Sequence, residues 1–213
     1  NGQYFDNGLD DEGIEGIAKR LFKESGKLAP GVMLRSLGGG WTLNELLGLV
    51  CTKRHLSMDS IPQGCILSAW IPLDHHTDWF GGAGNKRADL LWVTVYRGSD
   101  RGVKLMSTVV ESKFGWQSGL GRAGVKQVQQ TCAIIDKAFD PRAGSKDGRF
   151  WRESLVRAIE SAGVIEEEDF VHTSDGSSFG GTVKDEILNG SYEIAERDPR
   201  VVWHDPSMQI NED

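Results

Sequence analysis

Residues 88–113 read ADLLWVTVYRGSDRGVKLMSTVVESK, and each end of this stretch has the composition of a β-strand. Residues 88–96 and 103–113 are rich in β-branched and aromatic residues, which favour strands. Residues 97–102 (RGSDRG) between them contain the glycine, serine and aspartate that are typical of a tight turn. The sequence therefore predicts an antiparallel β-hairpin.

Charged residues lie at the open end of this hairpin. Asp89 is near the start of the first strand, and Glu111, Ser112 and Lys113 close the second. With a turn centred near residues 99–100, Asp89 lies opposite residue 110 or 111. Side chains alternate along a strand, so Lys113 shares the face of Glu111. We expect two carboxylates and a lysine to meet at one end of a buried sheet.

Two interpretations of this cluster follow from its charges. Opposed carboxylates repel one another, and buried charges need a partner. A divalent cation between Asp89 and Glu111 would remove the conflict, and Mg²⁺ prefers hard oxygen ligands and leaves positions for water and phosphate. Such an ion makes a bound water acidic enough to attack, and Lys113 could orient or deprotonate that water or hold charge on a phosphate. In the other interpretation, Lys113 forms an ordinary ion pair with one of the acids.

Further elements are predicted on both sides of the hairpin. Apolar residues at helical spacing predict four helices, and apolar runs predict one long and two short strands. The helices are expected over residues 10–25, from Thr42 onward, after Gly121 and over 150–162, and the strands over 65–73, 170–173 and 201–204. The core face of the helix after Gly121 should consist of Val125, Val128, Cys132, Ile135 and Phe139. This order predicts an α/β fold with a central mixed β-sheet flanked by helices.

Charge is distributed unevenly along the chain. The net charge is −7, but residues 84–126 hold eight basic and three acidic residues, a local charge of +5. Residues 164–213 hold three basic and 13 acidic residues, a local charge of −10. Either the basic segment faces a polyanion that the acidic end avoids, or both are solvated surfaces. We expect an N-terminal helical extension (1–41), a core (42–173) and an acidic C-terminal extension (174–213) that packs on the core or leaves it.

Composition argues against a membrane protein and against a disulfide scaffold. Hydrophobic residues make up 38% of the chain, and no apolar run approaches the roughly 20 residues of a spanning helix. The chain has three cysteines, an odd number that cannot all pair in disulfides, and each has apolar neighbours: Cys51, Cys65 and Cys132. This favours reduced cysteines in the core. We therefore expect a cytoplasmic protein.

Three motifs resemble the PD-(D/E)xK nuclease superfamily, which has the restriction-endonuclease-like fold. They are ADLLWV (88–93), VVESK (109–113) and, on the following helix, KQVQQT (126–131). The resemblance covers roughly residues 43–140, about half of the chain. It implies an αβββαβ core, with Asp89 and Glu111 as magnesium ligands, the Ser112 carbonyl as a backbone ligand and Lys113 as the catalytic lysine.

The resemblance also concerns two helical residues. Glu45 matches a further glutamate that many members carry on the helix before the first strand, where it would add a metal ligand. Alternatively, Thr42 and Glu45 form a capping box, in which the glutamate binds the N-cap amide. Gln127 matches a glutamine of the RecB-like branch, although Thr131 replaces the tyrosine that follows it there. Gln127 is either a catalytic residue or part of a solvated helix shoulder.

Phosphate contacts are expected from Arg87, Arg122 and Lys126. The glycine-rich residues 119–124 (GLGRAG) open a helix and would place backbone amides and Arg122 near a phosphate, unless they form an ordinary flexible loop. Phe114 and Trp116 follow the second hairpin strand and either stack on a base or pack in the core.

The sequence thus predicts magnesium-dependent hydrolysis of DNA phosphodiesters, with Mn²⁺ as an alternative metal and endonuclease favoured over exonuclease activity. The resemblance implies a module of a larger prokaryotic protein of restriction, anti-phage defence or DNA processing. Its partners would be DNA and other domains or subunits, such as a helicase-type ATPase or a second copy of the chain. One alternative is a non-catalytic DNA-binding or scaffold module of the same fold. Another is a different metal enzyme or a transferase that binds a nucleotide at residues 119–124.

Overall fold

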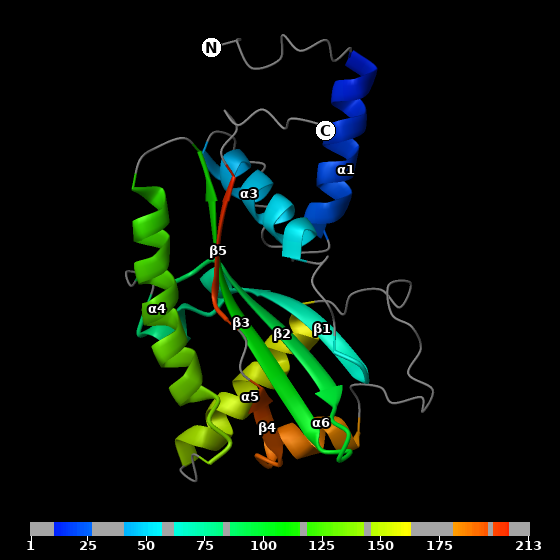
Figure 1. The fold of residues 1–213 in the computed structure, drawn as a ribbon, viewed down its shortest axis with the longest axis vertical. Coiled ribbons are helices and arrows are strands. Elements are labelled where there is room, and N and C mark those ends of the chain that lie inside the picture. The colour runs from blue at the N-terminus through cyan, green and yellow to red at the C-terminus, as the bar shows by residue number, and fades with distance from the viewer. Residues whose placement is uncertain are drawn as a thin grey trace.

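A computed structural model of the chain describes residues 11–26, 41–56, 62–82, 86–115, 119–142, 146–162, 181–195 and 198–204. Five strands form one mixed sheet flanked by helices, which confirms the predicted α/β class (Figure 1). The strands are β1 (Cys65–Pro72), β2 (Leu90–Arg97), β3 (Val103–Phe114), β4 (Tyr192–Ala195) and β5 (Arg200–His204). The helices are α1 (Asp11–Gly26), α3 (Trp41–Leu56), α4 (Leu120–Ala138), α5 (Lys146–Ser161) and α6 (Thr182–Leu188), with short 3-10 helices η1 (Leu73–His75) and η2 (Thr77–Phe80).

β2 and β3 form the predicted antiparallel hairpin. Leu90 pairs with Val110 at one end, and Arg97 pairs with Val103 beside the turn. Continuing this register by one residue places Asp89 opposite Glu111, as the sequence predicted. β1 pairs antiparallel with the other edge of β2.

Different helices cover the two faces of the sheet. One face packs against α4, α5 and α6, which contribute Val128, Ile159 and Ile187 to the larger core. The opposite face packs against α3, where Leu46 and Val50 belong to a second cluster with stacked tryptophans of β1 and β2. Because side chains alternate along β3, its residues 111 and 113 belong to the α4 face and residue 112 to the α3 face.

The C-terminal part of the described chain completes the sheet. β4 and β5 both pair in parallel with β3, along residues 103–106 and 110–114 respectively. β5 confirms the strand predicted at 201–204, whereas β4 and α6 were not predicted. The strand predicted at 170–173 and the boundary at residue 173 lie outside the described residues. Part of the region predicted as an acidic extension therefore supplies two strands to the central sheet.

One local prediction for a helix was wrong, and another is not tested. Val125 was expected in the core, but its side chain is 47% exposed. The inward position of this turn belongs to Gly124, whose missing side chain allows α4 to approach β3 and β5. α3 begins at Trp41, one residue before the predicted start. The side chain of Thr42 lies outside the described part of the chain, so the capping box stays a prediction.

The predictions about membrane spans and cysteines can be compared with the described residues. No described helix is long and apolar enough to cross a membrane. All three cysteine thiols are free. Burial raises the pKa of each thiol above its ordinary value, so the cysteines are protonated at neutral pH.

Candidate active site

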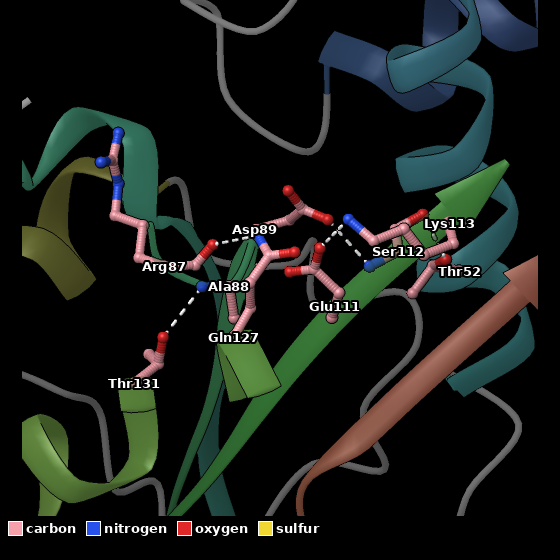
Figure 2. Close-up of polar contacts among 9 residues, drawn as sticks. All are labelled: Thr52, Arg87, Ala88, Asp89, Glu111, Ser112, Lys113, Gln127 and Thr131. Carbon is pink, nitrogen blue, oxygen red and sulfur yellow. Dashed lines mark hydrogen bonds and ion pairs between the residues drawn. The ribbon is translucent and has the colours of Figure 1, made fainter. Parts of the chain in front are cut away.

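Asp89 and Glu111 face each other across the open end of the hairpin. Asp89 directly precedes Leu90, the first residue of β2, and Glu111 follows Val110, the partner of Leu90. The amide of Ser112 donates a hydrogen bond of 2.8 Å to Oδ2 of Asp89. Figure 2 shows the two carboxylates directed toward one another. The structure thus brings together both of the carboxylates that the sequence singled out.

Burial opposes the negative charge on these two groups. The side chain of Glu111 is fully buried, and this burial, followed by the charge of Asp89, raises the pKa of Glu111. Burial also raises the pKa of Asp89, although the Ser112 amide and the nearby lysine partly offset it. Within the described residues, Oε2 of Glu111 has no hydrogen-bond partner. Negative charge on this pair is therefore unfavourable, because the described protein groups satisfy it only partly.

Lys113 supplies positive charge to the same end of the sheet. Its Nζ forms an ion pair with Oε1 of Glu111, which confirms that the two side chains share a face. The lysine side chain retains 19% exposure, whereas that of the glutamate has none. The ammonium group thus lies between a buried carboxylate and solvent, where a ligand can reach it.

Ser112 is held from the opposite face of the sheet. The hydroxyl of Thr52 on α3 donates a 2.9 Å hydrogen bond to Oγ of Ser112, and it also lies 3.1 Å from Nε2 of His204 in β5. A Cβ atom at Gly48 would lie 2.8 Å from the same Oγ, so the glycine permits the close approach of α3. These contacts hold β3 in place at Ser112, whose carbonyl would be a metal ligand according to the resemblance.

Two side chains of α4 hold the peptide group between Arg87 and Ala88, one residue before Asp89. Nε2 of Gln127 donates to the carbonyl of Arg87 at 2.9 Å, and Oγ1 of Thr131 accepts from the amide of Ala88 at 2.8 Å (Figure 2). Gln127 and Thr131 are four residues apart and therefore lie on one face of the helix. They bind both ends of a single peptide group, so in this structure they position Asp89.

The remaining predicted site residues lie around this centre. Glu45 is exposed on α3, and its negative charge contributes to the raised pKa of Asp89. Arg87 is occupied by the protein, because its Nε donates to the Leu73 carbonyl at 3.2 Å and its guanidinium forms a 2.5 Å ion pair with Asp74.

The predicted phosphate contacts and aromatic residues divide between solvent and core. Arg122 and Lys126 are both exposed on α4. Phe114 packs toward α3, since a Cβ atom added at Gly48 of that helix would lie 3.2 Å from the Cβ atom of Phe114. Trp116 lies outside the described residues.

A surface cavity of about 660 Å³ lies beside α4. Its walls include Lys86, Lys126, Gln127, Gln130, Phe80 and Ile134. Gln127 links the cavity to the site, because the same side chain holds the peptide group before Asp89. Two ammonium groups and two amides make this surface suitable for an anionic ligand that also has hydrogen-bonding groups.

Three residues that shape the site were not predicted from sequence: Thr52, Thr131 and Gly124. A signal existed for Thr131, because it lies on the apolar face of its helix, where a polar side chain needs a buried partner. No comparable signal existed for Thr52, whose partner Ser112 is 60 residues away.

Gly124 and Gly121 provide a matched test of how closely α4 packs on the site. A Cβ atom at Gly124 would lie 2.9 Å from Cγ1 of Val201 and 3.3 Å from Cγ of Glu111, whereas one at Gly121 would meet nothing within 4 Å. Gly121→Ala should therefore stabilise the protein by up to about 1 kcal/mol through helix propensity. Gly124→Ala should destabilise it, because overpacking typically costs about 1–3 kcal/mol. Thermal unfolding of both variants measures the difference, and equal shifts would contradict the close packing.

Comparison with known proteins gives no match to any protein-family model, curated protein or solved structure. The resemblance to the PD-(D/E)xK superfamily therefore stays a prediction that rests on the motifs quoted above. Within the residues that the structure describes, no three or more His, Cys, Asp or Glu side chains group in a way that could hold a metal ion. Any metal at this site would depend on two carboxylates together with backbone and solvent oxygens.

Proposed function

We propose that this chain is a magnesium-dependent nuclease domain of the PD-(D/E)xK type that hydrolyses DNA phosphodiesters. The observation that carries the proposal is the meeting of Asp89, Glu111 and Lys113 at one buried end of the sheet. One lysine can neutralise one carboxylate, and here a second carboxylate lies opposite. A divalent cation would satisfy the remaining negative charge, which otherwise opposes burial.

The donor atoms fit Mg²⁺. This ion takes hard oxygen ligands, usually one or two carboxylates, and keeps several water molecules. Asp89 and Glu111 would hold it together with the Ser112 carbonyl. Oε2 of Glu111 has no hydrogen-bond partner in the described part of the chain and is a donor atom for the purpose. When bound, the ion supplies Lewis acidity toward a phosphate and toward water. Mn²⁺ accepts the same class of oxygen ligands.

The chain's own residues have separate roles in this proposal. Lys113 places a positive charge where negative charge develops on the phosphate oxygens during hydrolysis. Gln127 and Thr131 keep the peptide before Asp89 in place, so that the carboxylate keeps its direction. Arg122 and Lys126 provide exposed positive charge on the helix that covers the site.

Incubation with plasmid and linear DNA tests the proposal directly. We expect the full chain to nick or linearise plasmid DNA with Mg²⁺ and to do neither with EDTA. A Glu111→Gln variant purified in the same way should be inactive, which excludes a contaminating nuclease. If the wild-type chain cleaves neither DNA nor RNA with Mg²⁺ or Mn²⁺, the proposed function is wrong.

One observation favours a second candidate, a non-catalytic DNA-binding module of the same fold. The ion pair between Lys113 and Glu111 already satisfies part of the buried charge without a metal. Such a module would bind DNA with no metal-dependent cleavage, so the same incubation, combined with a binding assay, separates the two candidates.

The salt dependence of DNA binding should locate the phosphate contacts. Arg122→Ala and Lys126→Ala should each weaken binding and reduce the slope of log K against log salt concentration by about 1, because fewer counterions are released. Lys137→Ala is the matched control, since this lysine is also exposed but lies in the last turn of the same helix. Arg87 is less suitable, because its removal would also break the ion pair with Asp74. Unchanged slopes for both test variants would place the DNA elsewhere.

A further inference from the structure

A large, partly exposed indole lies beside the proposed catalytic lysine. Trp203 of β5 pairs in parallel register with Lys113 of β3, and paired residues of adjacent strands point to the same face. Val201 lies two residues earlier in β5, so its side chain is on the same face as that of Trp203, and its neighbours identify this face. The Cβ position of Gly124 on α4 lies 2.9 Å from Val201 and 3.3 Å from Glu111. Trp203 therefore lies on the α4 face of the sheet beside Lys113, two residues beyond the position paired with Glu111.

The indole is fixed in position and yet open to solvent. Its Nε1 donates a hydrogen bond of 2.6 Å to the carbonyl of Gly115, directly after β3. The amide of Gly115 donates in turn to the carbonyl of His204, at 3.0 Å. Despite these contacts, 45% of the Trp203 surface remains exposed. The protein thus holds an aromatic ring at the site with much of its apolar surface uncovered.

We propose that Trp203 is a stacking platform for a nucleobase next to the phosphate that Lys113 approaches, an inference that rests on the proposed function. Aromatic side chains bind bases of any sequence, because every base has a π face. The charge beside the indole favours a nucleotide over an apolar protein partner, since Lys113 is the register partner of Trp203 on the adjacent strand. A phosphate on the lysine and its base on the indole would use both groups together.

This placement defines the substrate class more narrowly. A base can stack on a protein side chain only after it leaves its own helical stack. The nucleotide beside the cleaved bond is then unpaired, as in a single strand, a mismatch, a frayed end or a transiently opened base pair of a supercoiled plasmid. Single-stranded DNA should bind more tightly than a duplex of the same length.

Binding of a base-containing strand and of an abasic strand isolates the stacking. Fluorescence anisotropy would measure the DNA affinity of four proteins, with EDTA present so that no cleavage occurs. They are the wild-type chain and the variants Trp203→Ala, Trp203→Phe and Phe150→Ala. The probes are a labelled 12-nucleotide single strand and the same strand built from abasic sites. Phe150 is the matched control, because it is an aromatic residue on α5 with 58% exposure. Melting temperatures of all four proteins verify that each is folded.

Trp203→Ala should raise the Kd of the base-containing strand at least about fivefold, the lower end of measured base stacking. The Kd of the abasic strand should change less than about twofold, because phosphate contacts remain. Trp203→Phe loses the bond to Gly115 but keeps a stacking ring, so it should retain most of the affinity. Phe150→Ala should bind both strands like the wild type.

Several results would overturn the stacking role. These are an equal loss of affinity for both strands, no loss for either, a Trp203→Phe variant as weak as Trp203→Ala, or a wild type that binds neither strand. The result also separates this inference from the proposed nuclease function. If the wild type binds in a base-dependent way but does not cleave, the stacking platform is supported and the nuclease function is rejected. If the wild type cleaves DNA and Trp203→Ala has no effect on binding, the nuclease function is supported and the stacking platform is rejected.

Discussion

Lys113→Ala is expected to lower the rate of magnesium-dependent DNA cleavage by about 100- to 1000-fold, the typical loss when a well-placed electrostatic group is removed. The lysine shares the strand face of Glu111 and keeps contact with solvent, so its ammonium can reach the phosphate that approaches the carboxylates. It is not needed as a metal ligand. The variant should therefore fold and still be stabilised by Mg²⁺, which cleavage and thermal unfolding of one preparation would measure.

A purely structural lysine predicts a different result from the same preparation. Removing it would leave Glu111 buried opposite Asp89 without its partner, and breaking a buried ion pair costs roughly 3–5 kcal/mol. Lys104→Ala is the matched control, because Lys104 lies in the same strand and forms a 3.0 Å ion pair with Glu193. That pair is partly exposed, so its loss should change stability by less than about 1 kcal/mol. A stable Lys113→Ala protein that cleaves DNA at the wild-type rate would reject the assignment of this lysine.

The hairpin and its charged end could be predicted because they depend on local information. The turn at 97–102 fixes which residues of the two strands lie opposite one another, and alternation then fixes their faces. This register alone brings Asp89, Glu111 and Lys113 together, and the structure has the same register.

The surroundings of the site depend on contacts between distant parts of the chain, which no local pattern encodes. β5 reaches the site from about 90 residues farther along the chain and places Val201 and Trp203 beside Glu111 and Lys113. The face of α4 was misjudged by one residue, because hydrophobic periodicity places Val125 inward whereas close packing favours the neighbouring Gly124. Periodicity identifies apolar faces, but it contains no information about how closely two backbones approach.

Asp89→Asn combined with Glu111→Gln is expected to abolish the stabilisation of the protein by Mg²⁺. A ligand that binds only the folded state at 100 times its Kd adds about 2.7 kcal/mol, which corresponds to roughly 5–10 °C in melting temperature for a chain of this size. The wild type should show such a rise with Mg²⁺, and the double variant should show none. Glu193→Gln is the control, because it neutralises an exposed acid that pairs with Lys104 at the other end of the strand.

The same variant should weaken the pH dependence of the metal-free protein's stability. Burial, followed by the charge of Asp89, raises the pKa of Glu111 to about 8, above that of the unfolded chain. Both states bind the proton below about pH 4, but at higher pH the unfolded chain releases it first. The free energy of unfolding should therefore fall as the pH rises from about 4 to about 8, and it should do so less in the double variant.

At pH 8 without metal, the double variant should exceed the wild type in stability, because it no longer has to keep two buried carboxylates charged. With saturating Mg²⁺ the order should reverse, because only the wild type gains from the ion. This crossing is specific to a pair of carboxylates that burial disfavours and a cation relieves. If the double variant is less stable than the wild type at pH 8 and responds to Mg²⁺ to the same extent, Asp89 and Glu111 are structural residues and the ion binds elsewhere.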